Sequence, residues 1–543
     1  MKKRILTTAV IGTIIIGGLV SCRHLDEQVQ PTDIIESSVA ATEATTVEEI
    51  DESPTSDATQ ESEARDYADP SRLIIATALE TTSVAPARHN TFIGTLKNLM
   101  THNSPFRSQF DTLEPVSDIV SEWRAVSDVL FEFRLHEGIL FHNGEEMTAY
   151  DVEASFHYLR QYPYARNSHA SALEIEVIDR YTFTLYTGTP NAVLFFDLIA
   201  HGNAVLPESL IESGHDFTMQ PVGAGPFVFE EWRLGDSLHF RAFEYYWNPA
   251  RAPQIDEVVW RIIPEPSSRT IALETGEVDY VMEVAFGDVE RLTASDDVTV
   301  FMTPGTTFNM MLLNHNRPQF ENLYARKAIN MAIDQESLTM AAFNGLAVPT
   351  RAQLPTVFAG TTYEGTMPFD PAGAIALLSE HGIDPESLGF EMIASTEERR
   401  RMGEVVQAQL ADIGIPTTIT MMDHASSLTR FNGDDYEAGF GQWGASFLIS
   451  TLRGVVYGGP EGTSNRSNVN HPEINELIRQ GIATIDTDAR NAVFEQVSIL
   501  ANEYFVNVPT HQAMVVHAFN SQLRVPEINA MGIFYVNMIY WER

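Results

Sequence analysis

The most regular alternation of apolar and polar positions in the chain runs over residues 129–135. Every second side chain there is apolar, which is the pattern of a strand with one buried face. Gly138 ends the run. Asn143 and Gly144 then form a pair that tolerates positive φ and favours a tight turn. The pattern therefore predicts a strand followed by a sharp reversal of the chain.

A helix is predicted directly after this turn. Thr148 can cap its first turn, because the hydroxyl can accept from backbone amides and Asp151 completes an acidic form of the capping box. Apolar side chains at helical spacing follow over residues 149–159. Residues 122–159 as a whole predict strand, turn and capped helix.

Three further alternating or apolar runs predict strands in the first half of the chain. Residues 173–177 and 181–186 are joined by 178–180, which predicts a hairpin. Together with the strand at 129–135, this hairpin can form a small β-rich domain. Residues 72–78 are mostly apolar, as expected of a buried strand that begins an α/β lobe.

Strand and helix patterns alternate in the second half of the chain. A strand is predicted over residues 309–313, and helices are predicted over 324–334 and 371–382. Such alternation indicates a second α/β lobe.

The first 22 residues have the pattern of an export signal. A basic start at residues 1–4 precedes an apolar run over 5–20, and these 16 residues are fewer than the 20 or so that span a bilayer as a helix. Residues 19–22 resemble a lipobox, in which Cys22 is diacylated and becomes the new N-terminus. Cys22 is the only cysteine, so an intramolecular disulfide and a cysteine-based zinc site are excluded. The alternative is an ordinary signal peptide with an incidental cysteine.

An acidic segment separates this signal from the rest of the chain. Residues 26–69 contain 14 Asp or Glu and a single basic residue, Arg65. Such a composition cannot bury enough apolar surface to offset the entropy of ordering, so we expect a disordered tether.

The net charge of −40 argues against binding to nucleic acid, which needs clusters of Lys and Arg. The excess of acidic side chains is explained by a solvated surface.

No catalytic or cofactor motif is found in the chain. H-E-x-x-H, G-x-S-x-G and Walker sequences are missing, and the 16 histidines are scattered. Gly223 and Gly225 form a Gly-x-Gly, but Pro226 and a strand pattern follow where a nucleotide loop needs a helix. We therefore expect no cofactor, no metal and no enzyme. The alternative of a secreted hydrolase requires carboxylates that come together only in the folded chain.

Several sequence strings together resemble one protein family. Residues 122–152 contain E-W, F-x-L and G-x-x-F-H-N-G-E-x-x-T-A-x-D-V, residues 325–334 read A-R-K-A-I-N-M-A-I-D, and residues 405–414 include Q-A-Q-L-A-D-I-G. These strings resemble the extracytoplasmic solute-binding proteins of family 5, which are the oligopeptide, dipeptide and nickel receptors of ABC importers.

This resemblance implies an α/β, two-lobed periplasmic-binding-protein fold of type II, cluster C, with an extra small α+β domain. The implied domains are the signal peptide (1–21), the lipidated cysteine and tether (22–69), a discontinuous lobe I (70–95, 205–305 and 505–543), the small domain (96–204) and lobe II (306–504).

The ligand site implied by the resemblance lies around residues 436–447, which are similar to the family element G-W-x-A-D-Y. Trp443 matches the family tryptophan and Gly444 follows it. Ser446 stands where peptide-binding members have an Asp that pairs with the α-ammonium group of the ligand, and a neutral hydroxyl cannot compensate that charge. Phe308 and His89 are further candidate ligand contacts.

Other charged side chains can complete the site. Asp423, Asp434 or Asp435 can replace the missing carboxylate, and Arg453 and Arg466 can hold a ligand carboxylate.

We therefore expect a lipid-anchored, extracytoplasmic receptor that captures a peptide or another small molecule by hinge closure. Its partners are the membrane, through the lipid anchor, and an ABC permease with its ATPase subunits, and the receptor itself is a monomer. Ser446 favours the alternative of a non-peptide solute, such as an oligosaccharide or a metal chelate. A surface lipoprotein without a transport function is a further alternative.

Overall fold

The computed structural model describes residues 70–86, 88, 92–162, 172–199, 203–444, 446–458 and 465–542. All of them belong to one compact unit, Asp66–Arg543. The predicted signal peptide, the Cys22 lipobox and the whole tether, along with His89, lie outside the described residues. Among the described residues, no helix is long and apolar enough to cross a membrane.

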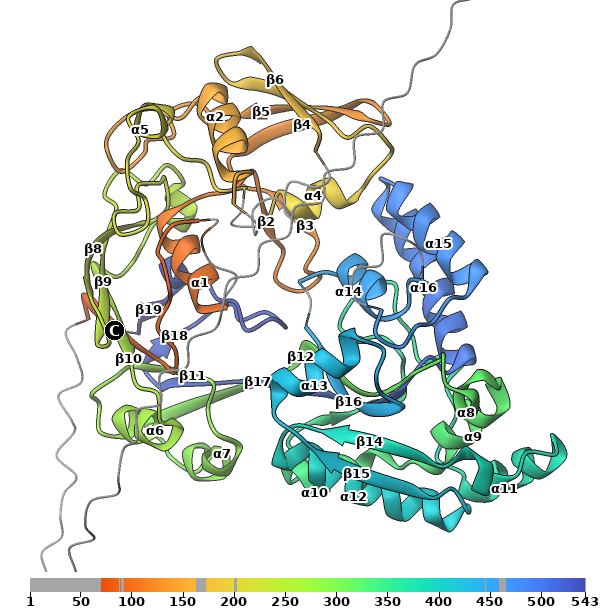
Figure 1. Cartoon of the computed structure of the whole chain (residues 1–543). Helices are drawn as coiled ribbons and strands as arrows, with labels where there is room; N and C mark the ends of the chain where they lie inside the picture. The colour runs from red at the N-terminus through yellow and green to blue at the C-terminus, as the bar shows by residue number, and fades with distance from the viewer. Residues whose placement is uncertain are drawn as a thin grey trace, which may run out of the picture. The chain divides into compact units, whose positions relative to one another are not determined.

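One large sheet runs through most of this unit (Figure 1). Its strand order is β15-β14-β16-β12-β17-β11-β1-β10-β9-β8, and β13 pairs with β17 outside this path. The strands are β1 (Arg72–Thr77), β8 (Phe227–Arg233), β9 (Ser237–Ala242), β10 (Glu257–Ile262), β11 (Tyr280–Met282), β12 (Val298–Leu313), β13 (Val348–Pro349), β14 (Phe390–Ala394), β15 (Thr417–Met421), β16 (Ala438–Trp443) and β17 (Val508–Asn520).

Two long antiparallel strands connect the two ends of this sheet. β12 and β17 pair with each other along most of their length. In addition, β17 pairs with β11 on one side, and β12 pairs with β16 on the other. The predicted first strand is confirmed as β1, which lies parallel to both β10 and β11. Its apolar run fits a strand that is covered on both faces.

The helices pack around this sheet and around a second, smaller one. They are α1 (Phe92–Thr101), α2 (Ala149–Leu159), α4 (Val193–Asp197), α5 (Glu208–Glu212), α6 (Pro266–Glu274), α7 (Phe286–Thr293), α8 (Pro318–Glu321), α9 (Leu323–Ala332), α10 (Gln335–Phe343), α11 (Pro371–Glu380), α12 (Glu397–Asp412), α13 (His424–Asn432), α14 (Leu448–Val455), α15 (Pro472–Ala483) and α16 (Thr487–Tyr504).

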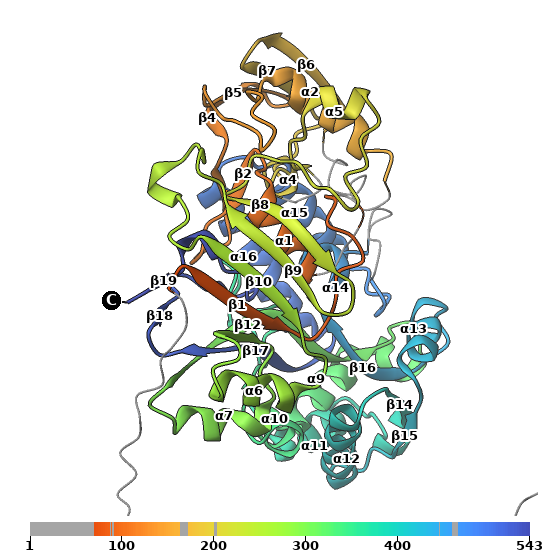
Figure 2. The same ribbon diagram turned by 90° about the vertical axis from the view of Figure 1, so that its left-hand side faces the viewer.

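The smaller sheet has four strands in the order β4-β5-β7-β6 (Figure 2). They are β4 (Val120–Ser127), β5 (Leu130–Leu135), β6 (Glu174–Asp179) and β7 (Thr182–Tyr186). The predicted hairpin and its pairing with the strand at 129–135 are thereby confirmed. Phe131, Phe133 and Leu135 are buried while the residues between them are not, as the alternation predicts.

Short β2 (Phe106–Ser108) pairs with β3 (Pro115–Ser117) next to this sheet, and β18 (Leu523–Arg524) pairs with β19 (Tyr540–Trp541) near the C-terminus.

The turn and helix cap predicted before α2 are also confirmed. Gly144 has a φ of 88°, in the region that glycine adopts without strain. Thr148 and Asp151 form a capping box. The Asp151 carboxylate accepts from the Thr148 amide at 2.7 Å and from its hydroxyl at 2.8 Å. The sequence pattern thus sets the start of α2.

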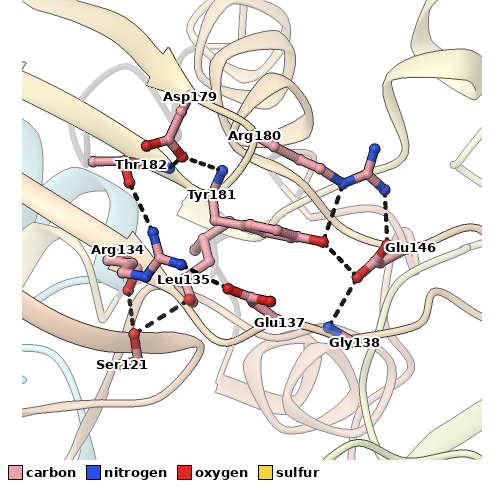
Figure 3. Close-up of polar contacts among 10 residues, drawn as sticks. All are labelled: Ser121, Arg134, Leu135, Glu137, Gly138, Glu146, Asp179, Arg180, Tyr181 and Thr182. Carbon is pink, nitrogen blue, oxygen red and sulfur yellow. Dashed lines mark hydrogen bonds and ion pairs between the residues drawn. The ribbon is translucent and has the colours of Figure 1, made fainter.

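A polar network ties this turn to the β6–β7 hairpin (Figure 3). The Glu146 carboxylate accepts from the Arg180 guanidinium at 2.7 Å, from the Tyr181 hydroxyl at 2.9 Å and from the Gly138 amide at 3.0 Å. Arg134 reaches the Glu137 carboxylate at 2.6 Å. Each arginine of this network therefore has a carboxylate partner.

The predicted helices of the second half are confirmed as α9 and α11. A further helix, α12, begins at Glu397 and was not predicted. The first turns of α12 consist mainly of charged residues, so they lack the apolar spacing that indicates a helix. Thr396 caps the helix, because its hydroxyl accepts from the Arg399 amide at 3.3 Å.

The Gly-x-Gly of residues 223–225 is followed by β8, as predicted. A Cβ atom on Gly225 would lie 2.4 Å from the carbonyl oxygen of Met100, at the end of α1. Glycine is therefore needed here for close packing of two backbone segments.

Candidate functional site

The end of β16 is the centre of the candidate site, and its pairing decides where each side chain points. Trp443 pairs with Phe308, and Gln442 pairs with Asn309. Asn309 also pairs with His511 of β17. Because side chains alternate along a strand, Asn309, Gln442 and His511 share one face of the sheet, and Phe308 and Trp443 share the other.

A cavity of about 440 Å³ lies on the face of Asn309 and Gln442, and we call it the Arg399 cavity. It lies where β12, β16 and β17 meet the first turn of α12. Phe286 of α7 and Phe343 of α10 form apolar parts of its wall. Its polar lining includes Asn309, Thr396, Glu398, Arg399, Gln442 and His511.

Arg399 is a buried cation at the wall of this cavity, with only 9% of its surface exposed. Its guanidinium donates to the Ser395 hydroxyl at 2.7 Å and to the Gln442 side-chain oxygen at 3.1 Å. Burial lowers the pKa of Arg399, although an arginine remains charged at neutral pH. Within the described residues, neither Arg399 nor the neighbouring Glu398 forms an ion pair. The cavity therefore presents one positive and one negative group, whose charges act on each other without forming an ion pair.

His511 adds no further charge to the Arg399 cavity at neutral pH. Burial, and then the charge of Arg399, lower the pKa of His511 to about 4. Its Nδ1 lies 3.1 Å from the Thr510 hydroxyl, and its ring packs on Phe343 with centroids 4.6 Å apart. The neutral ring is thus a polar wall that helps to exclude water.

A second cavity of about 170 Å³, which we call the Arg107 cavity, lies beside Ser446 and Phe447, just beyond the end of β16. Its walls are mostly apolar. They come from α1, β2, the segment around Phe196 and residues 531–537. The Phe447 ring packs against Phe196 with centroids 5.0 Å apart. Segments far apart in the sequence therefore meet around this cavity.

A buried ion pair forms the polar end of the Arg107 cavity. The Arg251 guanidinium lies 3.3 Å from the Asp118 carboxylate, and the Asn103 amide donates to that carboxylate at 2.8 Å. Burial raises the pKa of Asp118, and the charge of Arg251 opposes this effect. Arg251 also lies over the Tyr535 ring, 4.3 Å from its centroid. Asp118 is therefore already committed to protein partners.

The predicted site residues take different places in this arrangement. Ser446 is exposed and lines the Arg107 cavity, and Gly444 is exposed close to the Thr307 hydroxyl. Phe308 is fully buried, so its side chain packs in the core beneath β12. Trp443 is half-buried, and its ring packs so closely on Gly454 of α14 that a Cβ atom there would lie 2.2 Å away. Ligand contacts of these residues, and of His89, stay predictions.

The three aspartates considered as substitutes for the missing carboxylate line neither cavity. Asp423 caps α13 and accepts from the Ser426 amide at 2.9 Å. Asp434 accepts from the side-chain amides of Asn314 at 2.7 Å and Asn468 at 2.8 Å. Asp435 lies 3.6 Å from the Arg430 guanidinium. Each has a local structural partner.

Arg453 and Arg466 also lie outside both cavities. Arg466 donates to the Asn432 side chain at 3.1 Å. Arg453 is half-buried on α14, and its Nε is buried without a hydrogen-bond partner among the described residues.

Sequence reasoning missed Arg399, Glu398 and Arg107. The spacing of apolar residues could have shown that Arg399 lies on the buried face of α12. Met402, Val406 and Leu410, which are buried on that face, follow it by three, seven and eleven residues. For Arg107 we find no such signal, because its surroundings come from distant parts of the chain.

The described residues contain no group of three or more His, Cys, Asp or Glu placed to hold a metal ion. The two cavities thus offer charged, polar and apolar side chains for binding an organic solute.

The fold is that of type II periplasmic binding proteins. HbpA2 from Haemophilus parasuis superposes with a TM-score of 0.80 at 18% identity, over 87% of this chain and 100% of that one. DppA from Helicobacter pylori, a periplasmic binding protein solved in complex with the peptide STSA, superposes with a TM-score of 0.68 at 21% identity, over 87% and 98% of the two chains.

The model of the bacterial extracellular solute-binding proteins, family 5, matches residues 114–450. The chain therefore belongs to this family, whose members bind solutes and are not enzymes. A glutathione-binding protein, GsiB, of Salmonella paratyphi A is 27% identical over 331 residues, which are 59% of this chain and 63% of that protein. The chain thus matches somewhat less than two thirds of the length of this relative.

Proposed function

We propose that the protein is the ligand-capturing receptor of an ABC importer for small peptides. The observation that carries this proposal is the Arg399 cavity, where a buried arginine and Glu398 face the same space and neither has an ion-pair partner among the described residues. A peptide is a zwitterion, and its carboxylate and ammonium groups complement these two side chains. Peptide and glutathione ligands are named for two similar proteins.

The chemistry of Arg399 suits a carboxylate. A guanidinium donates two parallel hydrogen bonds to one carboxylate, and such charge-assisted bonds are roughly twice as strong as neutral ones. The guanidinium is already desolvated in the free protein, so little further desolvation opposes ligand binding.

Glu398 supplies the negative charge that Ser446 lacks. An ammonium group that enters a cavity needs an opposite charge, because an uncompensated buried ion costs several kcal/mol. In this proposal Glu398 takes over that role in the Arg399 cavity.

We propose that residues 70–95, 205–305 and 505–543 form one lobe, residues 306–504 a second lobe and residues 96–204 the small domain. The register of β12 against β17 shifts between Pro304 and Phe308, next to the boundary at 305. Irregular pairing of this kind is a suitable place for a hinge. The ligand-bound monomer would then close and dock on the permease.

We further propose that the mature protein is held on a membrane by a lipid on Cys22. Changing Cys22 to Ala should release the protein into the soluble fraction. A variant that stays in the membrane pellet without detergent contradicts the anchor, and the ligand proposal is unaffected by either result.

The ligand proposal is tested by native mass spectrometry of the full chain, followed by calorimetry with glutathione and a set of di- and tripeptides. We expect a co-purified or added peptide to bind with a stoichiometry of one and to be recovered intact. A co-purified oligosaccharide or metal chelate, without peptide binding, contradicts the peptide assignment. Cleavage of the peptide contradicts a pure binding function.

A further inference from the structure

Arg107 is a cation in a mostly apolar cavity, and no bonded partner of it is found among the described residues. It lies on β2, is half-buried and lines the Arg107 cavity. Its guanidinium forms no hydrogen bond and no ion pair within the described part of the chain. Its charge nevertheless acts on Asp118, because it opposes the rise in pKa that burial causes in that carboxyl. Arg107 and Asp118 both line the cavity.

The carboxylate in this cavity is not available to Arg107. Asp118 is buried between Arg251, at 3.3 Å, and the Asn103 amide, at 2.8 Å. Two arginines and one aspartate line the cavity, so one positive charge is left without a negative partner. The apolar walls strengthen the attraction of this charge for an anion, because they keep the local dielectric constant low.

The size of the cavity suits one carboxylate on a short alkyl chain. Its volume of about 170 Å³ holds roughly five or six waters at ~30 Å³ each, which is the room of a single side chain. Phe106, Phe196 and Phe447 can pack on methylene groups, while Arg107 meets the charged end.

The two cavities lie at the two ends of one short segment. Gln442 lines the Arg399 cavity and Ser446 lines the Arg107 cavity. Even fully extended, the chain from 442 to 446 covers at most ~13 Å at about 3.3 Å per residue, which is close to the length of a tetrapeptide. Gln442 and Ser446, and with them parts of the two cavity walls, therefore lie no farther apart than a short peptide can span.

We infer that the Arg107 cavity is a second carboxylate subsite, so that the ligand is a short acidic peptide with one carboxylate on Arg399 and another on Arg107. This inference rests on the proposed function and specifies its substrate class. Ser446 fits such a ligand, because an aspartate at this position would repel an acidic side chain from the same cavity.

The test compares tripeptides of Ala with Glu at the first, second or third position and the three matched peptides with Gln. Calorimetry on the full chain should show that at least one Glu peptide binds about 10- to 100-fold more tightly than its Gln counterpart, the range expected of a charge-assisted hydrogen bond. Arg107→Met should abolish this preference by weakening the Glu peptide much more than the Gln peptide, whose neutral amide forms only a weaker hydrogen bond, and Arg107→Lys should restore part of it. Arg124→Met, on exposed β4, is the matched control and should keep the full preference.

Two results would overturn the inference and leave the proposed function standing. One is equal binding of Glu and Gln peptides by the unchanged chain. The other is an Arg107→Met variant that loses Glu and Gln peptides by the same factor, because that indicates a purely structural role. If neither these peptides nor glutathione bind at all, the proposed function itself fails, and the subsite fails with it.

Discussion

The arginines of the four-stranded sheet and those of the two cavities differ in what surrounds their guanidinium groups. Arg134 and Arg180 each lie within 2.7 Å of a carboxylate oxygen, on the surface of the small sheet (Figure 3). Arg399 and Arg107 line cavities and have no ion pair among the described residues. The first pair of arginines links a turn to a hairpin, whereas the second pair is left for a ligand.

Burial alone does not decide whether an arginine is available to a ligand, as Arg326 shows. Its guanidinium is 1% exposed and donates to the backbone carbonyl oxygens of Phe320, Glu321, Tyr504 and Phe505 at 2.8 to 3.1 Å. Arg326 lines neither cavity, and protein acceptors surround its donors. An arginine is therefore a candidate for ligand binding when it faces a cavity and lacks a carboxylate, and it is structural when its donors are already satisfied.

The largest effect on stability is expected for Arg326→Met. The change leaves buried carbonyl groups of α8 and of the end of α16 without donors, and each such group costs about 1 to 3 kcal/mol. We expect the free energy of unfolding to fall by about 3 to 5 kcal/mol in urea titrations. A loss no larger than that of Arg401→Met, an exposed arginine, would contradict the structural role of Arg326.

A buried cation without a hydrogen-bond partner should lower stability, in contrast to Arg326, and Lys97 of α1 is such a group among the described residues. Its ammonium has no hydrogen-bond partner among the described residues and lies 5.2 Å from the centre of the Trp260 ring. Burial lowers the pKa of Lys97 to about 7, with a smaller opposite effect from Glu80. Lys97→Met should raise the free energy of unfolding by about 2 to 4 kcal/mol at pH 6.

The sign of the pH dependence of Lys97 follows from the lowered pKa. Between pH 7 and the ordinary lysine pKa near 10.5, the unfolded chain binds a proton at Lys97 that the folded chain has lost, so the folded chain becomes more stable as pH rises. The advantage of Lys97→Met is therefore largest at or below pH 7 and shrinks toward pH 10.5. Lys327→Met serves as the control, and an equal pH dependence in both variants would argue against this account.

The smallest effect is expected in the network of the small sheet. Arg180→Gln removes a surface ion pair with Glu146, and such pairs contribute little because water and salt screen them. The urea midpoint should stay within error of the unchanged chain, and peptide affinity should not change. A clear loss of peptide binding would contradict the claim that arginines paired with a protein carboxylate take no part in ligand binding.

The local features of the fold could be predicted, because neighbouring residues determine them. The alternation at 129–135, the Asn143–Gly144 turn and the Thr148 cap act over a few residues, and each is found where the pattern placed it. Helix α12 was missed, because the run of charged residues at its start has no apolar spacing.

The site was less predictable, because its chemistry depends on tertiary contacts. Ser446 was recognised from a local motif, but the Arg107 cavity also needs Arg251 and Tyr535, which no local pattern links to β2. Ligand contacts of Trp443 and Phe308 stay predictions, and the pairing of β12 with β16 places both side chains on the face opposite Gln442. Strand register decides such questions, and the sequence pattern did not specify it here.

The central claim is that an arginine left without a carboxylate at a cavity wall binds the carboxylate of a peptide. Calorimetry with Ala-Ala-Ala on the full chain, on Arg399→Met and on Arg401→Met of the same helix tests it most directly. Arg399→Met should weaken binding about 10- to 100-fold, because one charge-assisted contact is lost, while Arg401→Met should bind as the unchanged chain does. Equal affinities of all three proteins for the peptide would contradict the account.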